Sequence, residues 1–302
     1  MKRKGFTLVE LLVVIAIIAL LMGLLMPALS RVRQMAYRMV CGSNLAGIGK
    51  AMMIYAHDWD EEYPKGGTRN CDWSTTGSIS DWEGGADHIQ AVAFSDGTAT
   101  IWSCFYLLIK FADVTPKQFI CNGDTGVKAF KLSDVVPLPV DADMEVTEGW
   151  DFGNEPGTQY SYAYHMPFGT YLITVSSNPG CPVAADRNPY LDQNADAYID
   201  GADAEEVAPS WFNNAYYDTD KTGNAAAHQR EGQNVLFNDS HVNFEKWPNC
   251  GVNNDNIWKW WQATSPTAQQ KQLCDGGEPD EVGDFEPQSE EDAFLVNEDQ
   301  DY

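Results

Sequence analysis

The chain is poor in basic residues for its length. Its 302 residues include 19 Lys and Arg but 44 Asp and Glu, which gives a formal net charge of −25. Nucleic-acid binding depends largely on Lys and Arg side chains that neutralise phosphates. The acidic balance therefore argues against a nucleic-acid-binding surface, and no nucleic-acid partner is expected.

The sequence also lacks the common catalytic motifs. It has no G-x-S-x-G, no H-E-x-x-H and no glycine-rich phosphate loop, so nothing supplies a partnered nucleophile or a phosphate cradle. We predict a protein that is not an enzyme.

None of the seven cysteines forms a C-x-x-C pair, which argues against a zinc ribbon or a thioredoxin-like site. Their wide spacing, together with an export-like N-terminus, favours structural disulfides outside the cytoplasm. The odd number leaves at least one cysteine outside any intramolecular pair, and the sequence assigns no connectivity.

A long apolar run follows a basic N-terminus. No charged residue occurs from Leu11 to Ser30, which is long enough for a helix to cross a hydrocarbon core of about 30 Å. The basic residues before it place the N-terminus in the cytoplasm. A cleaved signal peptide fits poorly, because the run is too long and no small-x-small site follows it. A plain anchor leaves Glu10 unexplained, since a carboxylate in the membrane is costly without a partner.

The stretch that carries a resemblance reads KGFTLVELLVVIAIIALLMGLLMPAL. It resembles the class III signal and N-terminal helix of type IV pilins and type II secretion pseudopilins. The resemblance implies that a prepilin peptidase cleaves between Gly5 and Phe6, and that the new N-terminal Phe6 is methylated. It also implies that Pro27 corresponds to the helix-kinking proline that pilins commonly carry.

Cleavage would give Glu10 a partner. The new α-ammonium of Phe6 can pair with the Glu10 carboxylate of a neighbouring subunit, and in low dielectric such a pair is far better than either charge alone. The alternative is a carboxylate that snorkels to the membrane interface.

The helical pattern continues beyond Ser30. Apolar residues recur at helical spacing from Val32 to Tyr55, which predicts an amphipathic helix. A helix from Phe6 to about Trp59 would be roughly 80 Å long. We expect its first half to lie in a membrane or filament core and its second half to pack on a globular head.

A narrower resemblance covers most of the chain in scattered blocks. CGSNLAGIGKAMMIYAHDWDEEYP, QFICNGDT, SYAYH, AADRNPYL, GQNVLFNDSHVNF and CGVNNDNIW are similar to the planctomycete-type H-X9-DG group of prepilins. The motif itself departs from the pattern. Ten residues, not nine, separate His228 from Asp239, and Ser240 stands where the group has glycine.

The predicted fold class is α+β: a long N-terminal helix, transmembrane in its first half, packed on an antiparallel sheet head with long loops. Strands are expected within 91–104, within 170–177 and in a hairpin over 232–247. The expected segments are a leader (1–5), an assembly helix (6–30), its amphipathic continuation (31–63), an extracytoplasmic head (64–274) and an acidic, loosely packed tail (275–302).

Three histidine and aspartate residues invite a metal or catalytic interpretation: His228, Asp239 and His241. Asp239 and His241 would share a face of a strand. They also flank a turn, in which an aspartate bonds its own backbone. Structural, metal-binding and catalytic roles all stay open at this point.

A second candidate site has the oxygen-ligand spacing of an EF-hand or dockerin-type calcium loop. Its ligands would be Asp192, Asn194, Asp196, Tyr198 through its carbonyl, Asp200 and Asp203. Ala197 replaces the glycine of the sharp turn, and Asp203 replaces the usual glutamate. The alternative is a solvated acidic loop.

Ten tryptophans are numerous for such a head, and Trp258, Trp260 and Trp261 cluster. Exposed aromatic side chains bind glycans or partners, whereas buried ones form a core.

These observations predict a structural subunit of a type IV pilus-like or type II secretion-like filament, anchored in the inner membrane with its head in the periplasm or on the cell surface. Its partners would be its own copies, the prepilin peptidase and the assembly machinery. The alternative is a membrane-anchored surface-binding module.

Overall fold

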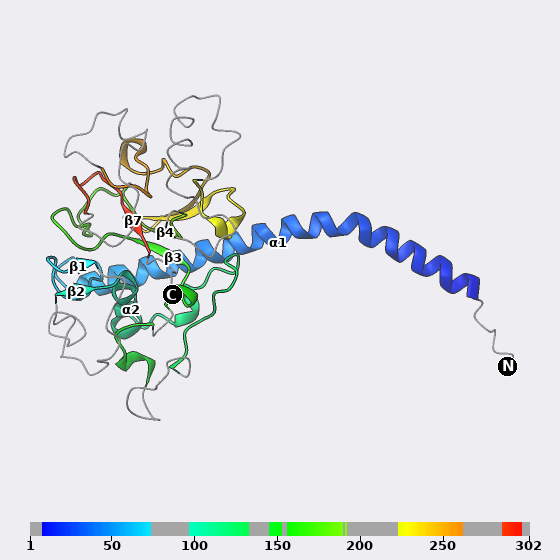
Figure 1. Ribbon diagram of the computed structural model, residues 1–302, viewed down its shortest axis with the longest axis horizontal. Coiled ribbons are helices and arrows are strands. Elements are labelled where there is room, and N and C mark those ends of the chain that lie inside the picture. Colours follow the sequence, from blue (N-terminus) through cyan, green and yellow to red (C-terminus); the bar gives the residue numbers. More distant parts are fainter. Residues whose placement is uncertain are drawn as a thin grey trace.

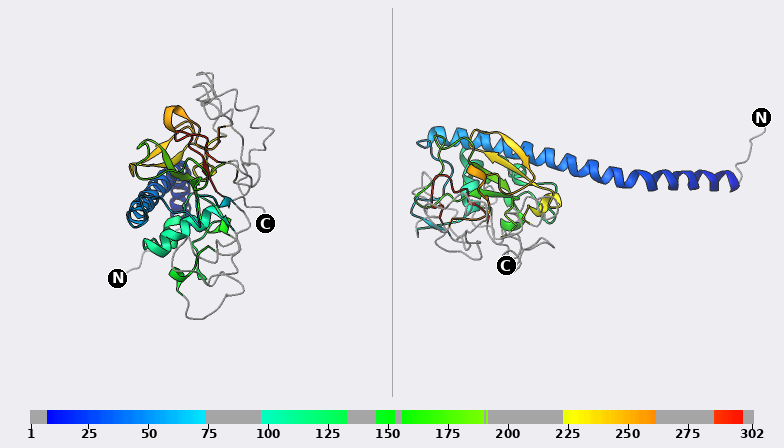
Figure 2. Two further views of the ribbon diagram at one scale, coloured as in Figure 1. Left: turned by 90° about the vertical axis from the view of Figure 1, so that its left-hand side faces the viewer. Right: turned by 90° about the horizontal axis from the view of Figure 1, so that it is seen from above.

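The computed structural model describes residues 8–73, 97–132, 145–152, 156–189, 191, 223–261 and 286–297. One helix, α1 (Leu8–Asp58), runs from the N-terminal end into a mixed head. Figure 1 shows α1 as a curved rod whose first half extends away from all other elements, and the right-hand view of Figure 2 shows the head on one side of its second half. The predicted α+β fold with a long N-terminal helix is confirmed.

Helix α1 is continuous over 51 residues, which corresponds to about 77 Å. Pro27 lies inside the helix without ending it. The helix ends where Asp60 and Glu61 adopt positive φ angles of 51° and 65°, and the Glu61 amide donates to the Ala56 carbonyl. A left-handed residue after the last turn is a common way to close a helix.

The head is built on a five-stranded antiparallel sheet in the order β6-β5-β4-β3-β7. The strands are β3 (Tyr162–His165), β4 (Pro182–Asp186), β5 (Gln233–Phe237), β6 (Val242–Glu245) and β7 (Leu295–Val296). The predicted hairpin is confirmed, because β5 and β6 pair from Gln233↔Glu245 to Leu236↔Val242.

Both faces of the sheet are covered. Tyr162 and Tyr164 pack in a core cluster with residues of α1, whereas Ala163 between them packs in a second cluster with Trp258. Leu236 and its neighbour Val235 divide between the clusters in the same way. This alternation follows from the two-residue period of a strand, and it makes every residue of β5 buried.

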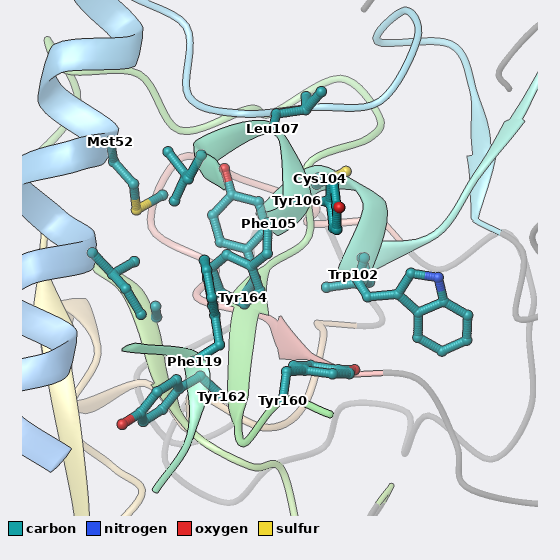
Figure 3. Close-up of a cluster of buried hydrophobic side chains, with 14 of the residues drawn as sticks. Met52, Trp102, Cys104, Phe105, Tyr106, Leu107, Phe119, Tyr160, Tyr162 and Tyr164 are labelled. Carbon is teal, nitrogen blue, oxygen red and sulfur yellow. The ribbon is translucent and has the colours of Figure 1, made fainter. Parts of the chain in front are cut away.

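The larger cluster lies between α1, the sheet and α2 (Ile101–Phe111). Thr100 caps α2, since its side chain accepts a hydrogen bond from the Ser103 amide. Figure 3 shows Phe105 of α2 among aromatic rings, and its ring centroid lies 4.8 Å from that of Tyr164.

The remaining described elements are short. They are β1 (Asp72–Trp73), β2 (Thr98–Ala99), η2 (Pro116–Phe119), η4 (Val146–Glu148), η5 (Pro156–Thr158), η7 (Ala226–His228) and η8 (Val252–Asn254). The strand expected within 91–104 is therefore largely wrong for its described part: residues 98–99 are extended, but α2 begins at Ile101 behind its threonine cap.

Two further expectations need correction. Residues 170–177 form no strand; Thr174 makes one isolated bridge to Glu62. Residues 286–297 were expected to belong to a loosely packed tail, but β7 pairs with β3. Acidic composition misled here, because Ala293, Phe294, Leu295 and Val296 supply enough apolar surface to complete both core clusters.

Candidate functional site

The first half of α1 exposes its apolar side chains. From Leu8 to Leu29 they include Leu8, Leu20, Leu24, Met26 and Leu29, each at least 67% exposed. The helix is long and apolar enough to cross a membrane, and no residue of its most apolar window is buried in the head. Glu10 lies in its first turn, whereas Gly5 and Phe6 lie outside the described residues.

Packing on the head begins later than the sequence predicts. Val32, Met35 and Met39 belong to the predicted amphipathic stripe, yet they are 61%, 58% and 70% exposed. The buried face begins at Cys41 and continues at helical spacing through Leu45, Ile48, Met52 and Tyr55. Residues 31–40 therefore contribute no buried residue, although Arg38 contacts Glu231 and Phe244 of the head.

The first buried residue of α1 is also its covalent link to the head. Cys41 forms a disulfide with Cys121, which lies after η2, 80 residues further along the chain. One helical turn later, the Asn44 amide donates to the Ile120 carbonyl at 2.9 Å. A cross-link that closes so long a loop stabilises the fold mainly by restricting the unfolded chain.

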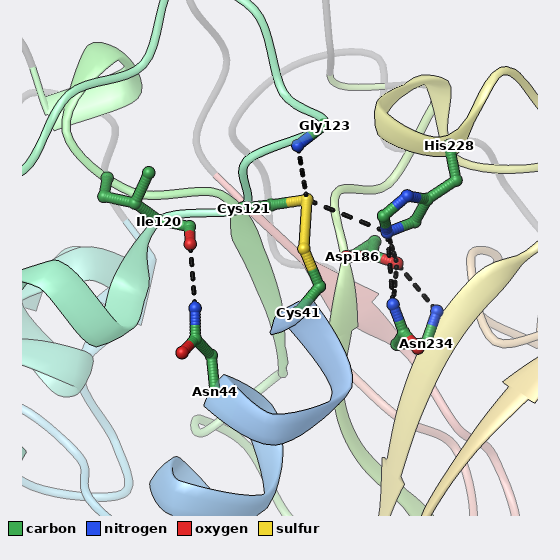
Figure 4. Close-up of polar contacts among 8 residues, drawn as sticks. All are labelled: Cys41, Asn44, Ile120, Cys121, Gly123, Asp186, His228 and Asn234. Carbon is green, nitrogen blue, oxygen red and sulfur yellow. Dashed lines mark hydrogen bonds and ion pairs between the residues drawn. A yellow bond between two sulfur atoms is a disulfide. The ribbon is translucent and has the colours of Figure 1, made fainter. Parts of the chain in front are cut away.

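Figure 4 shows His228 of η7 beside this disulfide. Its Nε2 lies 3.2 Å from Asp186 Oδ2 and 3.7 Å from Cys121 Sγ. The Asn234 side-chain amide lies 3.1 Å from the same Nε2, and the Asn234 backbone amide donates to Asp186 Oδ2 at 2.7 Å. His228 and Asp186 are fully buried, so α1, β4, β5 and η7 meet at one dry polar cluster.

The other two residues of the predicted trio lie elsewhere. Asp239 and His241 are at the exposed β5–β6 turn, where the His241 ring pairs with the Asp239 carboxylate. The His241 backbone amide and ring hold the pKa of Asp239 below its ordinary value. A metal site made of His228, Asp239 and His241 is therefore wrong: His228 is buried in the cluster, and the other two serve the turn.

Ser240 lies in the same turn. This residue has a φ of 69°, in the left-handed region that favours glycine because a Cβ is crowded there. Its amide still closes the turn by donating to the Phe237 carbonyl at 2.8 Å. Serine thus adopts a backbone conformation that glycine takes at less steric cost.

Among the described residues, metal-ligating side chains come together in one group: Cys41, Cys121, Asp186 and His228, all buried. The sequence blocks that resemble prepilins contain Cys41, Cys121 and Asp186, but the sequence predicted a role only for His228, which lies outside these blocks. No local pattern joins them, because they come from four segments.

Two of the three closely spaced tryptophans are core residues. Trp258 is fully buried and Trp261 is 5% exposed, and the Trp261 indole donates to Asp255 at 2.6 Å. The core interpretation is confirmed for these two side chains, and the glycan-binding interpretation of Trp258 is wrong. The calcium-loop residues from Asp192 to Asp203 lie outside the described part of the chain.

The N-terminal segment has a recognisable counterpart among protein families. Residues 1–26 match the prokaryotic N-terminal methylation motif. The match covers the basic start, Gly5, Phe6 and the apolar run up to Met26, and it supports a type IV pilin-like protein with a prepilin-type N-terminus that anchors the chain in a membrane. Comparison with curated proteins and with solved structures gave no match.

Proposed function

We propose that the chain is a structural subunit of a type IV pilus-like or type II secretion-like filament, made as a prepilin that is cleaved between Gly5 and Phe6. The observation that carries this proposal is the division of α1. One continuous helix exposes its apolar side chains up to Met39 and buries a face in the head from Cys41 onward. The prepilin-type N-terminus supports the same function.

The exposed half of α1 supplies the surface through which copies would assemble. In the membrane its side chains contact lipid, and in a filament they would contact the same half of neighbouring copies. Apolar contact with lipid and apolar contact with another helix are similar in free energy, so packing and polar pairs decide association. The Glu10 carboxylate, paired with the Phe6 ammonium of a neighbour, would supply such a pair and set the register.

The charge distribution supports an orientation with the N-terminus in the cytoplasm. Lys2, Arg3 and Lys4 precede the apolar run, and positive residues stay on the cytoplasmic side. The head would then lie in the periplasm or on the cell surface. The finer assignment to the H-X9-DG group rests on the sequence blocks, and the left-handed conformation of Ser240 supports it.

Processing is tested by Gly5→Ala in cells that contain a prepilin peptidase. We expect the variant to keep Met1 through Gly5, whereas the wild-type chain begins at Phe6. Gly23→Ala is the matched control, because a Cβ at Gly23 meets no atom within 4 Å, and it should be processed normally. Mass spectrometry of the purified chains reads the outcome; a Gly5→Ala product that starts at Phe6 would refute cleavage by this peptidase.

Assembly is tested by Glu10→Ala. We expect the chain to insert and to be cleaved, but to yield few sheared filaments, because the Phe6 ammonium has lost its partner. Leu11→Ala, one position further along α1, controls for a general loss of side-chain volume. Filaments at wild-type abundance from Glu10→Ala would remove the pairing argument.

We also propose that residues 192–203 bind calcium, and this proposal rests on the spacing of their oxygen ligands alone. Calorimetric titration of the full chain with Ca²⁺ is expected to show one site that Asp196→Ala abolishes and Asp239→Ala does not. Absence of binding heat in the wild-type chain would leave these residues as a solvated acidic loop.

A further inference from the structure

The buried cluster around the Cys41–Cys121 disulfide contains two further side chains that can bind a metal ion, those of Asp186 and His228. Cys41, Cys121, Asp186 and His228 each offer one ligand atom, and these atoms lie within 4.8 Å of one another. Two sulfurs, one imidazole nitrogen and one carboxylate oxygen are ligands that Zn²⁺ prefers.

Two of the distances between the ligand atoms are close to those of a tetrahedral site, whereas the two sulfurs, bonded to each other in the disulfide, must move apart on reduction. With Zn–S near 2.3 Å and Zn–N and Zn–O near 2.1 Å, a tetrahedral ion would hold nitrogen and oxygen about 3.4 Å apart and nitrogen and sulfur about 3.6 Å apart. The structure has 3.2 Å between His228 Nε2 and Asp186 Oδ2, and 3.7 Å between Nε2 and Cys121 Sγ.

The polar atoms around His228 Nε2 converge on the Asp186 carboxylate. Nε2 lies 3.2 Å from Asp186 Oδ2 and 3.1 Å from the Asn234 side-chain nitrogen, which itself donates to Asp186 Oδ2 at 3.2 Å. A protonated Nε2 and Asn234 can therefore both donate to Asp186. With Nε2 unprotonated, its lone pair and those of Oδ2 face the same space, and a metal ion would accept both.

Two further atoms of the cluster are buried without partners. Within the described part of the chain, neither His228 Nδ1 nor Asp186 Oδ1 has a hydrogen-bond partner. Buried polar atoms are usually paired. The other ring nitrogen, Nε2, faces Cys121 Sγ and Asp186 Oδ2.

We propose that this group is a Zn²⁺ site whenever Cys41 and Cys121 are reduced, so that one cluster fastens α1 to the head in two redox states. A thiol reductant supplies two electrons and two protons to the disulfide and is itself oxidised to a disulfide. The S–S bond breaks to give two thiols. Zn²⁺ then displaces both thiol protons and binds two thiolates, His228 Nε2 and Asp186 Oδ2.

The proposal is tested on the full chain in detergent micelles, with Co²⁺ as a spectroscopic substitute for Zn²⁺. After reduction and removal of metals, we expect one equivalent of Co²⁺ to give thiolate-to-metal charge-transfer absorption and the visible bands of a tetrahedral site. Zn²⁺ should abolish both. The oxidised chain, which has no thiolates at this position, should show neither.

Variants assign the signal to the cluster. Cys121→Ser should lose the charge-transfer absorption, and Asp186→Asn should weaken Co²⁺ binding about 10-fold or more. Cys71→Ser and His241→Ala, which change a cysteine and a histidine outside the cluster, should leave both signals unchanged. If the reduced metal-free chain unfolds, recovery of its circular dichroism on adding Zn²⁺ supports the site.

Three results would overturn the proposal: a reduced, folded chain without charge-transfer absorption, absorption that persists in Cys121→Ser, or a reduced, unfolded chain that Zn²⁺ does not refold. None of these outcomes depends on whether the chain forms filaments.

Discussion

The two halves of α1 share one helix and an apolar character but have different surroundings. Up to Val40 no residue is buried, whereas from Cys41 one face is buried against β5, β6, η2 and α2. The boundary coincides with the disulfide that joins Cys41 to Cys121. Hydropathy alone therefore does not distinguish the apolar side chains that pack against their own chain from those that remain available to a membrane or another copy.

Glycines mark the difference between the halves more clearly than apolar residues do. A Cβ at Gly23 would meet nothing within 4 Å, whereas a Cβ at Gly49 would lie 2.7 Å from a methyl carbon of Leu236. The glycines of the second half weaken the helix by propensity. They nevertheless lie where α1 closely approaches the sheet and the η2 region.

The test with the largest expected effect replaces one leucine by alanine in each half of α1. Leu45 is fully buried and Leu20 is 67% exposed. We expect Leu45→Ala to lower the free energy of unfolding of the head by about 2–5 kcal/mol, because a cavity remains, and Leu20→Ala to leave it unchanged. All ten tryptophans lie at or after Trp59, so their fluorescence during denaturation in micelles reports on the head alone. Equal effects of the two substitutions would contradict the division.

A second test asks how dry the head interior is. Asp151 is buried, and desolvation raises its pKa to about 7, although the Trp102 indole and the Phe152 amide donate to its carboxylate. The folded state therefore holds a proton up to about pH 7 that the unfolded chain loses near pH 4. Stability from this group falls as pH rises between these values.

Comparison with Asp151→Asn isolates this contribution. The free energy of unfolding of the wild-type chain, relative to the variant, is expected to fall by roughly 2–4 kcal/mol between pH 4 and pH 8. Taking the difference cancels the contributions of other titrating groups, such as His165, whose pKa is lowered by burial to about 4. Parallel pH profiles for the two proteins would show that water reaches Asp151.

A third test enlarges one glycine in each half. Gly49→Val places methyl groups against Leu236 and is expected to lower the free energy of unfolding of the head by about 1–3 kcal/mol through overpacking. Gly23→Val is the matched control and should not change it. Gly49→Val with wild-type stability would mean that α1 can shift away from β5 at little cost.

The test with the smallest expected effect concerns the boundary between the two halves of α1. Arg38 forms an ion pair with Glu231 and lies over the Phe244 ring at 4.5 Å. The Glu231 side chain is 46% exposed, so Glu231→Gln should lower the free energy of unfolding by less than about 1 kcal/mol. The effect should shrink at high salt. Glu290→Gln, at an exposed glutamate outside the described ion pairs, serves as the control, and a larger loss for Glu290→Gln would contradict this role of the pair.

Local patterns in the sequence predicted the elements that need few long-range contacts. The apolar run and the helical spacing predicted α1 to within a few residues of its ends, and alternating residues around Asn238–Ser240 predicted the β5–β6 hairpin. A helix and a tight hairpin are stabilised by bonds between near neighbours, so their signals lie within short stretches.

Tertiary contacts decided the rest. Whether Val32 or Leu45 is buried depends on where the head lies along α1, and helical spacing is the same for both. The acidic residues around 286–297 concealed β7, because its stability comes from pairing with β3 and not from local propensity. The buried cluster joins Cys41, Cys121, Asp186 and His228 from four segments. Such proximity arises only when the chain is folded, since burial of distant apolar side chains and not any local pattern brings the segments together.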